Sequence, residues 1–177
     1  MILPILKYPH PLLTLECTPV QAVTPTLREL AASMAETMYA AQGIGLAAPQ
    51  VGAPLRMIVV DVSGPEERTA LMTLINPELT PLGGPMDSEE GCLSVPDYRN
   101  TLQRASRVRC EATDLDGSPI TLEAEETLAV CLQHEVDHLH GRLFLDHLSR
   151  LKRSLYESRL KKQARRAAQD SPARDAL

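Results

Sequence analysis

The sequence predicts an α+β fold, with antiparallel β-sheets packed around a buried central helix and an amphipathic helix at the C-terminal end. Three observations support this prediction. Segments rich in β-branched residues cluster between helical segments without a regular strand–helix alternation. Residues 107–124 alternate apolar and polar side chains around an Asp-Gly pair, which is typical of a β-hairpin. Residues 125–140 form a helical stretch that is apolar on most sides, as expected inside a core.

The first helix is expected within residues 24–43. Thr24 or Thr26 can cap its first turn, and Pro25 suits a first helical position because its missing N–H is not needed there. Gly43 is well placed to end the helix. Apolar side chains recur at helical spacing along one stripe, which comprises Leu27, Leu30, Met34, Met38 and Ala41.

Strands are expected at residues 55–62 and 71–79, where β-branched and aliphatic side chains are frequent. Residues 81–100 show no sustained period, so we interpret them as irregular. The pair Asp116-Gly117 marks the turn of the predicted hairpin, because these two residue types tolerate the left-handed conformation that tight turns require.

Two further helices complete the prediction. The central helix covers roughly residues 125–140 and is closed by Gly141. A final amphipathic helix begins near Leu148, with Leu151 and Leu155 as its apolar stripe.

The composition excludes several classes of protein. The 177 residues are 44% hydrophobic and 23% charged, and no apolar run is long enough for a membrane span. The first residues lack a basic region followed by an apolar stretch, so we expect no secretory signal and a cytoplasmic location. The spacing of the four cysteines does not suggest a disulfide scaffold, and we expect thiols.

The stretch CLQHEVDHLHGRLF, residues 131–144, contains a pattern that can bind a metal ion. His134 and His138 lie about 40° apart around a helix and one turn apart along it, so both imidazoles can reach one ion. Glu135 projects beside that face and is placed to accept a proton from a water on the metal. A chance match is the alternative, but three ionisable groups in an apolar helix would be costly to bury without a partner.

Two histidines do not hold a catalytic metal, so a third ligand is required. Zinc proteases with an extended motif need a histidine where this chain has Phe144. Another class of metalloprotease takes its third ligand from a glutamate in a later helix. Glu157 is the only glutamate after the motif, and it lies in a short basic tail, where a buried metal ligand is not expected. Cys131 is seven residues from His138, or about 10 Å along a helix, and is therefore too distant for one ion.

Cys17 lies in a proline-bounded stretch, and Cys110 lies in a strand, where a cysteine is typically a core residue. Cys92 is the remaining candidate. Gly91 lets the backbone bend and leaves room beside the thiolate. A cysteine beside acidic residues resists ionisation unless a cation stabilises the negative charge, and a metal is such a cation. We therefore favour a site with a fourth position open for water, which fits metal-assisted hydrolysis. Its ligands are Cys92, His134 and His138.

Three motifs follow one another along the chain: GIGLAAPQ at residues 43–50, EGCLS at 90–94 and QHEVDHL at 133–139. Together, and in this order, they resemble the motifs of the peptide deformylase family. The similarity runs from ILKYPHPLL to LFLDHLS, over nearly the whole body of the chain. The resemblance implies a metal-dependent hydrolase that removes the N-formyl group from the N-terminal formylmethionine of newly made polypeptides and releases formate. It implies Fe(2+) as the cellular metal, with Zn(2+) or Ni(2+) able to occupy the site.

The resemblance also implies roles for individual residues. Glu135 becomes the general base and later the acid that protonates the leaving amine. The side-chain amide of Gln50 and the backbone N–H of Leu93 become donors to the oxyanion, where each donor is worth about 3 kcal/mol. The metal ligands that it implies are those favoured above, Cys92, His134 and His138.

The first motif suggests how a peptide would bind. Gly43 and Gly45 allow a substrate backbone to approach closely, and Ile44 and Gly45 are expected to form an edge with which an extended peptide pairs. Arg99 is a candidate for contact with the peptide backbone, and a surface ion pair is the alternative. A methionine side chain needs an apolar pocket, whose candidate walls are Ile44, Gly91, Val130 and Cys131.

The charge is unevenly distributed along the chain. Residues 1–147 carry 9 basic and 20 acidic side chains, or −11, whereas residues 148–177 carry 9 and 3, or +6. We expect a single catalytic domain in the first segment, and a basic helix with a frayed end in the second. A solvated helix is the plain interpretation of the tail, and docking to the ribosome is a hypothesis that a nascent-chain substrate suggests. Neither a membrane nor DNA is expected as a partner.

Two other functions stay open. The chain could be a metalloprotease that uses Glu157 as a ligand, and Cys92→Ala would separate this case because only a deformylase would lose its metal. It could also be a metal-containing binding protein without turnover, although the intact Glu135, Gln50 and Leu93 argue against this.

Overall fold

The computed structural model describes residues 1–170, so most of the frayed end expected at residues 169–177 lies outside the described residues. Contacts divide the chain into two compact units, Met1–Phe144 and Leu145–Leu177. None of the described helices combines the length and the apolar character that a membrane crossing requires.

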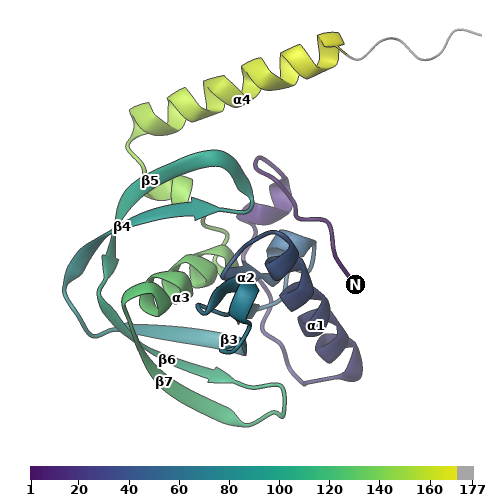
Figure 1. The fold of residues 1–177 in the computed structure, drawn as a ribbon, viewed down its shortest axis with the longest axis vertical. Helices are drawn as coiled ribbons and strands as arrows, with labels where there is room; N and C mark the ends of the chain where they lie inside the picture. The colour runs from purple at the N-terminus through teal and green to yellow at the C-terminus, as the bar shows by residue number, and fades with distance from the viewer. Residues whose placement is uncertain (171–177) are drawn as a thin grey trace, which may run out of the picture. The chain divides into compact units, whose positions relative to one another are not determined.

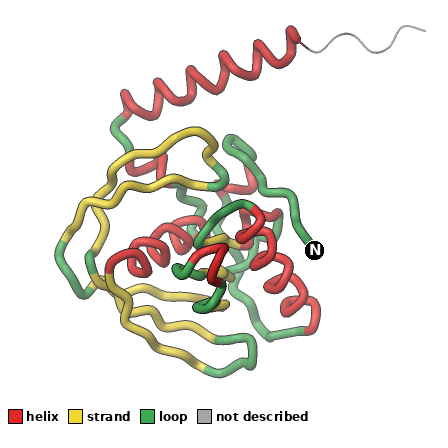
Figure 2. Tube along the Cα trace, in the orientation of Figure 1, coloured by secondary structure: helices red, strands yellow, loops and turns green. Residues whose placement is uncertain are grey.

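Two antiparallel sheets form the framework of the first unit (Figure 2). One has five strands in the order β1-β2-β3-β6-β7, and the other is the two-stranded β4-β5. The strands are β1 (Gly45–Ala47), β2 (Met57–Val60), β3 (Met72–Pro81), β4 (Pro85–Cys92), β5 (Val95–Ala105), β6 (Arg107–Thr113) and β7 (Pro119–Glu125). The helical elements are η1 (Pro11–Thr14), α1 (Pro25–Ala40), η2 (Ala48–Val51), α2 (Gly64–Glu67), α3 (Glu126–Leu139), η3 (Phe144–His147) and α4 (Arg150–Asp170).

The central helix α3 lies between the two sheets (Figure 1) and contacts strands of both. Its apolar side chains, such as Leu132 and Leu139, are fully buried. The helix ends at Leu139, and Gly141 then adopts a left-handed φ of 65°, which suits glycine because it has no Cβ. The predicted α+β fold with a buried central helix is therefore confirmed.

The first predicted helix is present as α1. Thr24 is its N-cap, and the Thr24 side chain accepts a hydrogen bond from the Leu27 N–H. The expectation that Gly43 ends the helix is wrong, because the chain reverses one residue earlier, at Gln42, whose φ is 58°. At position 43, a Cβ would lie 2.9 Å from the Leu93 side chain, which would have to shift to accommodate it.

The hairpin β4–β5 was not expected, because residues 81–100 read as irregular. Both strands are largely polar, and along β4 exposed residues alternate with half-buried residues and with the buried Glu90. A two-stranded sheet with this little burial lacks the apolar alternation that reveals a strand in the sequence. The hairpin β6–β7, by contrast, has its turn at the predicted place, with Gly117 at a φ of 82°.

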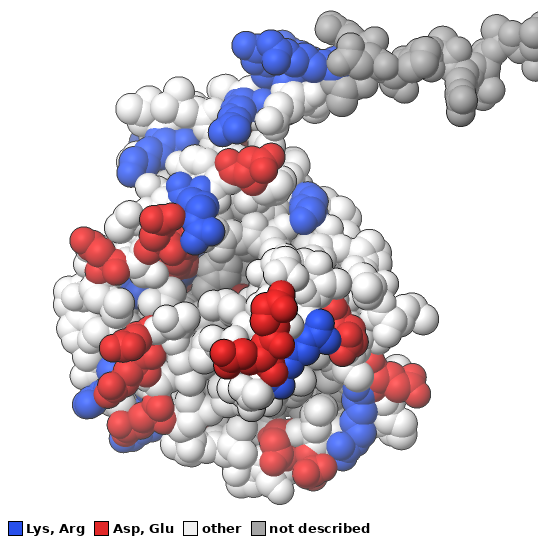
Figure 3. All heavy atoms as spheres, in the orientation of Figure 1, with Lys and Arg blue, Asp and Glu red and all other residues white. Residues whose placement is uncertain are grey.

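The second unit contains α4, which begins two residues after the expected Leu148. Arg153 forms ion pairs with Asp146 at 2.6 Å and with Glu157 at 3.1 Å. Leu151 and Leu155 are 70% and 63% exposed. Lys and Arg side chains follow one another along this helix, whereas basic and acidic side chains are interspersed on the visible face of the first unit (Figure 3).

Candidate metal centre

Helix α3 brings three functional side chains of the HExxH pattern into the interior. His134, Glu135 and His138 are 8%, 4% and 1% exposed. The two imidazole rings have centroids 5.1 Å apart and meet edge to face, as side chains one turn apart on a helix do.

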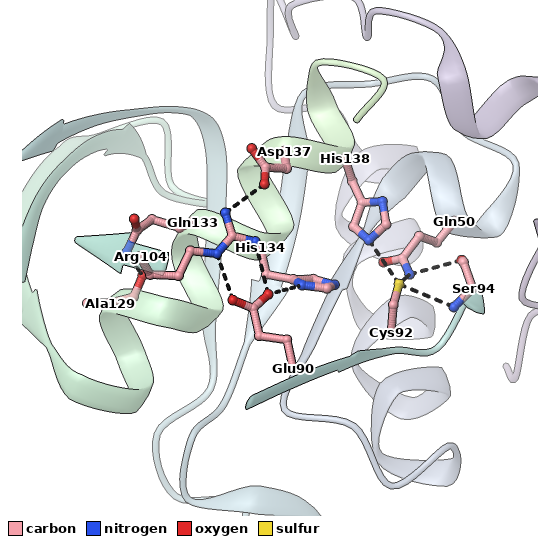
Figure 4. Close-up of polar contacts among 10 residues, drawn as sticks. All are labelled: Gln50, Glu90, Cys92, Ser94, Arg104, Ala129, Gln133, His134, Asp137 and His138. Carbon is pink, nitrogen blue, oxygen red and sulfur yellow. Dashed lines mark hydrogen bonds and ion pairs between the residues drawn. The ribbon is translucent and has the colours of Figure 1, made fainter. Parts of the chain in front are cut away.

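Cys92, the last residue of β4, completes the cluster (Figure 4). Its Sγ lies 3.3 Å from His138 Nε2, and ligand atoms of Cys92, His134 and His138 all lie within 4.8 Å of one another. Metal–ligand bonds of 2.0–2.3 Å in a tetrahedral site would separate ligand atoms by about 3.4–3.6 Å. The three side chains therefore need little movement to hold one ion.

The environment of Cys92 favours a thiolate. Burial alone would raise the pKa of the thiol, but the positive charge of His138 and hydrogen bonds from His134 and His138 outweigh it and lower the pKa to about 5. The Ser94 N–H donates to Sγ at 3.4 Å, and Gln50 Nε2 lies 3.7 Å away. A thiolate is the form of cysteine that binds metals.

Two buried side-chain atoms of the described residues lack a hydrogen-bond partner, Glu135 Oε2 and His138 Nδ1. Both belong to this cluster, although buried polar atoms are normally paired. Burial also raises the pKa of Glu135 to about 6, which suits a group that exchanges protons near neutral pH. A thiolate, two imidazoles and an adjacent unpaired carboxylate oxygen together fit a divalent metal site with a proton acceptor beside it.

Gly45 allows the backbone of β1 to lie directly against this carboxylate. A Cβ at residue 45 would lie 2.4 Å from Glu135 Oε1 and 2.7 Å from Cys131 Sγ. The close approach that we expected for a substrate is thus made, at this position, by Glu135 itself.

Gln50 and Leu93, the two expected oxyanion donors, lie beside Cys92. The Gln50 side chain is 2% exposed and fixed at both ends, since its Oε1 accepts the Ala47 N–H at 2.8 Å and its Nε2 donates to Ser94 Oγ at 3.1 Å. The Gln50 side chain is therefore a buried, fixed amide and not a solvated loop group.

A buried ionic network behind His134 was not predicted from the sequence (Figure 4). Glu90 accepts two hydrogen bonds from Arg104, at 2.7 and 2.9 Å, and pairs with His134 Nδ1 at 2.8 Å. Arg104 also donates to Asp137 at 2.7 Å. Burial would raise the pKa of Glu90, but the hydrogen bonds from Arg104 and His134 lower it overall. A Glu90 carboxylate on Nδ1 leaves Nε2 of His134 free to bind a metal.

One signal for part of this network was present in the sequence. Glu90 and Cys92 are two residues apart, so in a strand they share one face. Arg104 and Asp137 carried no comparable signal, because their proximity to Glu90 depends on the pairing of β4 with β5 and on the packing of that hairpin against α3.

The expected substrate residues line one cleft of about 1160 Å³. Its edge includes β1, which is an edge strand of the five-stranded sheet. The Cys131 thiol donates to the Ile44 carbonyl at 3.5 Å, and Arg99 pairs with Glu89 at 3.0 Å with both side chains 68% exposed. The predicted substrate residues in the lining are Ile44, Gly45, Gly91, Arg99, Val130 and Cys131.

The two positions that were considered for an alternative third metal ligand, residues 144 and 157, make other contacts. Phe144 stacks against His134 with ring centroids 6.3 Å apart, at the position where an extended zinc-protease motif would have histidine. Glu157 pairs with Arg153 within the second unit. Among residues whose placement is described, the cluster of Cys92 with the two histidines is the one group of three that could hold an ion.

Comparisons with known proteins agree with one another. A family model described as polypeptide deformylase matches residues 2–154. A peptide deformylase of Acinetobacter baumannii is 47% identical over 173 residues, covering 97% of each chain. A crystal structure of a peptide deformylase from Legionella pneumophila has a TM-score of 0.88 and 40% identity, covering 97% of this chain and 100% of that one. A peptide deformylase from Ehrlichia chaffeensis in complex with actinonin has a TM-score of 0.85 and 38% identity, covering 92% and 97%.

Proposed function

The chain belongs to the polypeptide deformylase family, and we propose that it removes the N-formyl group from the N-terminal formylmethionine of newly made polypeptides in the cytoplasm. The products are formate and a free amino terminus. The observation that supports this most directly is the cluster of Cys92, His134 and His138 beside the buried carboxylate of Glu135. A relative solved in complex with actinonin supports the assignment of the cleft as the ligand site.

We propose that Cys92, His134 and His138 hold one divalent ion, which is Fe(2+) in the cell and can be replaced by Zn(2+) or Ni(2+). When bound, such an ion acts as a Lewis acid that makes water a nucleophile near neutral pH and polarises a carbonyl oxygen. Mixed thiolate and imidazole ligands suit all three of these metals.

The protein groups around the ion then divide the remaining work. Glu135 takes a proton from the attacking water and delivers it to the nitrogen of the leaving amine. The Gln50 amide and the Leu93 N–H donate to the formyl oxygen as negative charge develops on it. Because the Gln50 amide is already fixed by Ala47 and Ser94, little reorganisation is required during the reaction.

The cleft orients the substrate. An extended peptide adds to the free edge of β1 through backbone hydrogen bonds. The methionine side chain then lies among the apolar lining residues Ile44, Val130 and Cys131.

Formate release from formyl-Met-Ala-Ser tests the proposal. The metal-loaded wild type is expected to release one formate for each peptide. Glu135→Gln keeps the size of the side chain but removes the proton acceptor, so the rate should fall by a factor of about 10²–10⁴ while the metal content is unchanged. A wild-type protein that carries metal and releases no formate would overturn the assignment.

We propose that residues 1–147 form the catalytic domain and that the basic helix in residues 148–177 docks on the ribosome. Residues 148–169 carry eight basic side chains and one acidic side chain, and phosphate-directed contacts of such a helix weaken with salt. Truncation after Ser149 should spare formate release from short peptides and reduce co-sedimentation with ribosomes at low salt. Equal co-sedimentation of the full-length and truncated proteins would contradict ribosome docking.

A further inference from the structure

Three consecutive residues near the N-terminus form hydrogen bonds with both segments that carry the proposed oxyanion donors. These segments are η2, which contains Gln50, and the β4–β5 turn, which contains Leu93. We propose that Leu6–Tyr8 form a strap that positions these donors, and that Lys7 within the strap is a positioning residue for the Leu93 N–H and for the Cys92 thiolate. The proposal rests on the function proposed above. The three contacts are Leu6 N to Gln50 O at 2.7 Å, Lys7 Nζ to Leu93 O at 2.5 Å and Tyr8 N to Ser94 O at 2.8 Å.

The turn that carries Leu93 needs support from outside the hairpin. Leu93 and Ser94 connect β4 to β5, since Cys92 pairs with Val95. Two-residue hairpin turns match the twist of their strands when one or both residues have positive φ. Neither Leu93 nor Ser94 does, and the strand register shifts directly before Cys92. The hairpin therefore does not fix this turn by its own geometry.

The strap holds two successive peptide groups of this turn. The Lys7 ammonium donates to the Leu93 carbonyl, and the Tyr8 N–H donates to the Ser94 carbonyl. Holding the peptide group after Leu93 restricts the orientation of the Leu93 N–H, the expected donor, because only φ and ψ of Leu93 separate the two groups. Gln50, the other donor, is held on its backbone carbonyl by Leu6.

Lys7 also acts on the sulfur through a single peptide group. The Leu93 carbonyl and the Ser94 N–H belong to the same peptide, and this N–H donates to Cys92 Sγ at 3.4 Å. A cation on the carbonyl oxygen polarises the peptide and strengthens the hydrogen bond made by its N–H. A stronger hydrogen bond to a thiolate ligand withdraws electron density from the sulfur and tunes the metal that it binds.

The backbone of the strap is fixed although the Lys7 side chain is exposed. Leu6 and Tyr8 bond on either side of Lys7, and the Leu3 N–H donates to Thr37 Oγ1 of α1 at 2.9 Å. The ammonium therefore starts from a fixed Cα, which reduces the entropy lost when the side chain binds the Leu93 carbonyl.

The test compares cobalt-loaded wild type with Lys7→Met, Lys7→Arg and the control Arg109→Met, which removes one positive charge from an exposed pair with Glu123. Each protein is assayed with amidated formyl-Met-Ala-Ser, and its thiolate-to-cobalt absorption band is recorded. Lys7→Met should lower kcat about tenfold with KM unchanged. Its band should move to longer wavelength, because a less hydrogen-bonded thiolate gives up electrons more readily.

Lys7→Arg, which keeps a cationic donor, should restore both kcat and the band, and Arg109→Met should match the wild type in both. Either a Lys7→Met band at the wild-type wavelength or an unchanged kcat overturns the proposal. A higher KM with unchanged kcat also overturns it, because Lys7 would then contact the peptide itself. Formate release by the wild type in the same assay separates failure of this inference from failure of the proposed function.

Discussion

Helix α3 and the hairpin β4–β5 each carry part of the candidate metal centre, but they are held in place by different forces. Apolar residues such as Leu132 and Leu139, each 0% exposed, anchor α3 in the core. The hairpin is largely polar, and it is tied to the helix where Glu90 pairs with His134 and Arg104 donates to Asp137. Gln133 of α3 adds two more bonds, to the backbone N–H and carbonyl of Ala105 at 2.9 Å each.

This contrast shows how two sets of candidate metal ligands can be fixed to each other. Apolar burial is non-directional and places a helix in the core, but it does not define the position of a single sulfur atom. Charge-assisted hydrogen bonds are directional and lose much energy when misaligned. The position of Cys92 relative to the two histidines therefore depends on a few polar contacts.

The largest effect is expected when the hairpin loses its ligand. Cys92→Ala removes the sulfur and should weaken metal binding more than about 100-fold. Loss of a residue that only hydrogen-bonds to a metal ligand typically costs about 10–100-fold, and loss of the ligand itself should cost more. Metal titration of the purified protein, with formate release as a second readout, measures this loss. Cys110→Ala, which removes a buried thiol of β6 outside the cluster, should retain the metal.

A smaller but still severe effect is expected when the hairpin is detached from the helix. Arg104→Met leaves the buried Glu90 without its main partner, so stability should fall by about 3–5 kcal/mol. The metal should bind about 10–100-fold more weakly, because His134 loses its fixed orientation.

Urea unfolding and metal titration measure both effects of Arg104→Met. The matched change Arg109→Met breaks an exposed pair and should cost at most about 1 kcal/mol. Equal losses for the two variants would show that the buried network has no special role.

A change in the packing of helix α3 should lower the stability of the protein without weakening metal binding. Leu132→Ala creates a cavity beneath α3 and should reduce stability by about 2–5 kcal/mol. Since no polar contact to Cys92 or the histidines is removed, metal affinity of the folded protein should change less than about threefold. A metal affinity that falls with stability would mean that packing alone positions the ligands.

The smallest effect is expected at the exposed side of the hairpin. Arg99 and Glu89 form an ion pair in which both side chains are 68% exposed, so solvent screening leaves it worth about 0–1 kcal/mol. Arg99→Met should therefore leave the unfolding midpoint nearly unchanged. An increase in KM for longer formyl-peptides would assign Arg99 to substrate binding, and an unchanged KM would leave it a surface pair.

The same contrast explains which parts of the fold and the candidate site could be predicted from the sequence. A helix in a core carries a periodic apolar pattern, so α3 and the spacing of His134 and His138 were predicted correctly. Cys92 was reached by excluding other ligands, and the structure brings it to 3.3 Å from His138. The hairpin that carries it was read as irregular because its stability does not come from an apolar face.

Partners that are far apart in the chain and belong to no metal-binding motif could not be predicted. Arg104 and Asp137 are 33 residues apart, and Lys7 and Leu93 are 86 apart. Ion pairs and backbone contacts of this kind depend on the completed packing, and no local pattern encodes them. The prediction of where α1 ends was wrong for a local reason. Gln42 adopts the left-handed conformation that glycine usually supplies.

The absence of a side chain at residue 45 limits how this protein could evolve resistance to a compound bound in the cleft. Even a methyl group there would collide with Glu135, so a replacement that obstructs the compound would also displace the carboxylate that we propose as the proton acceptor. Escape variants should instead arise at wall positions such as Val130, while selection keeps position 45 as glycine.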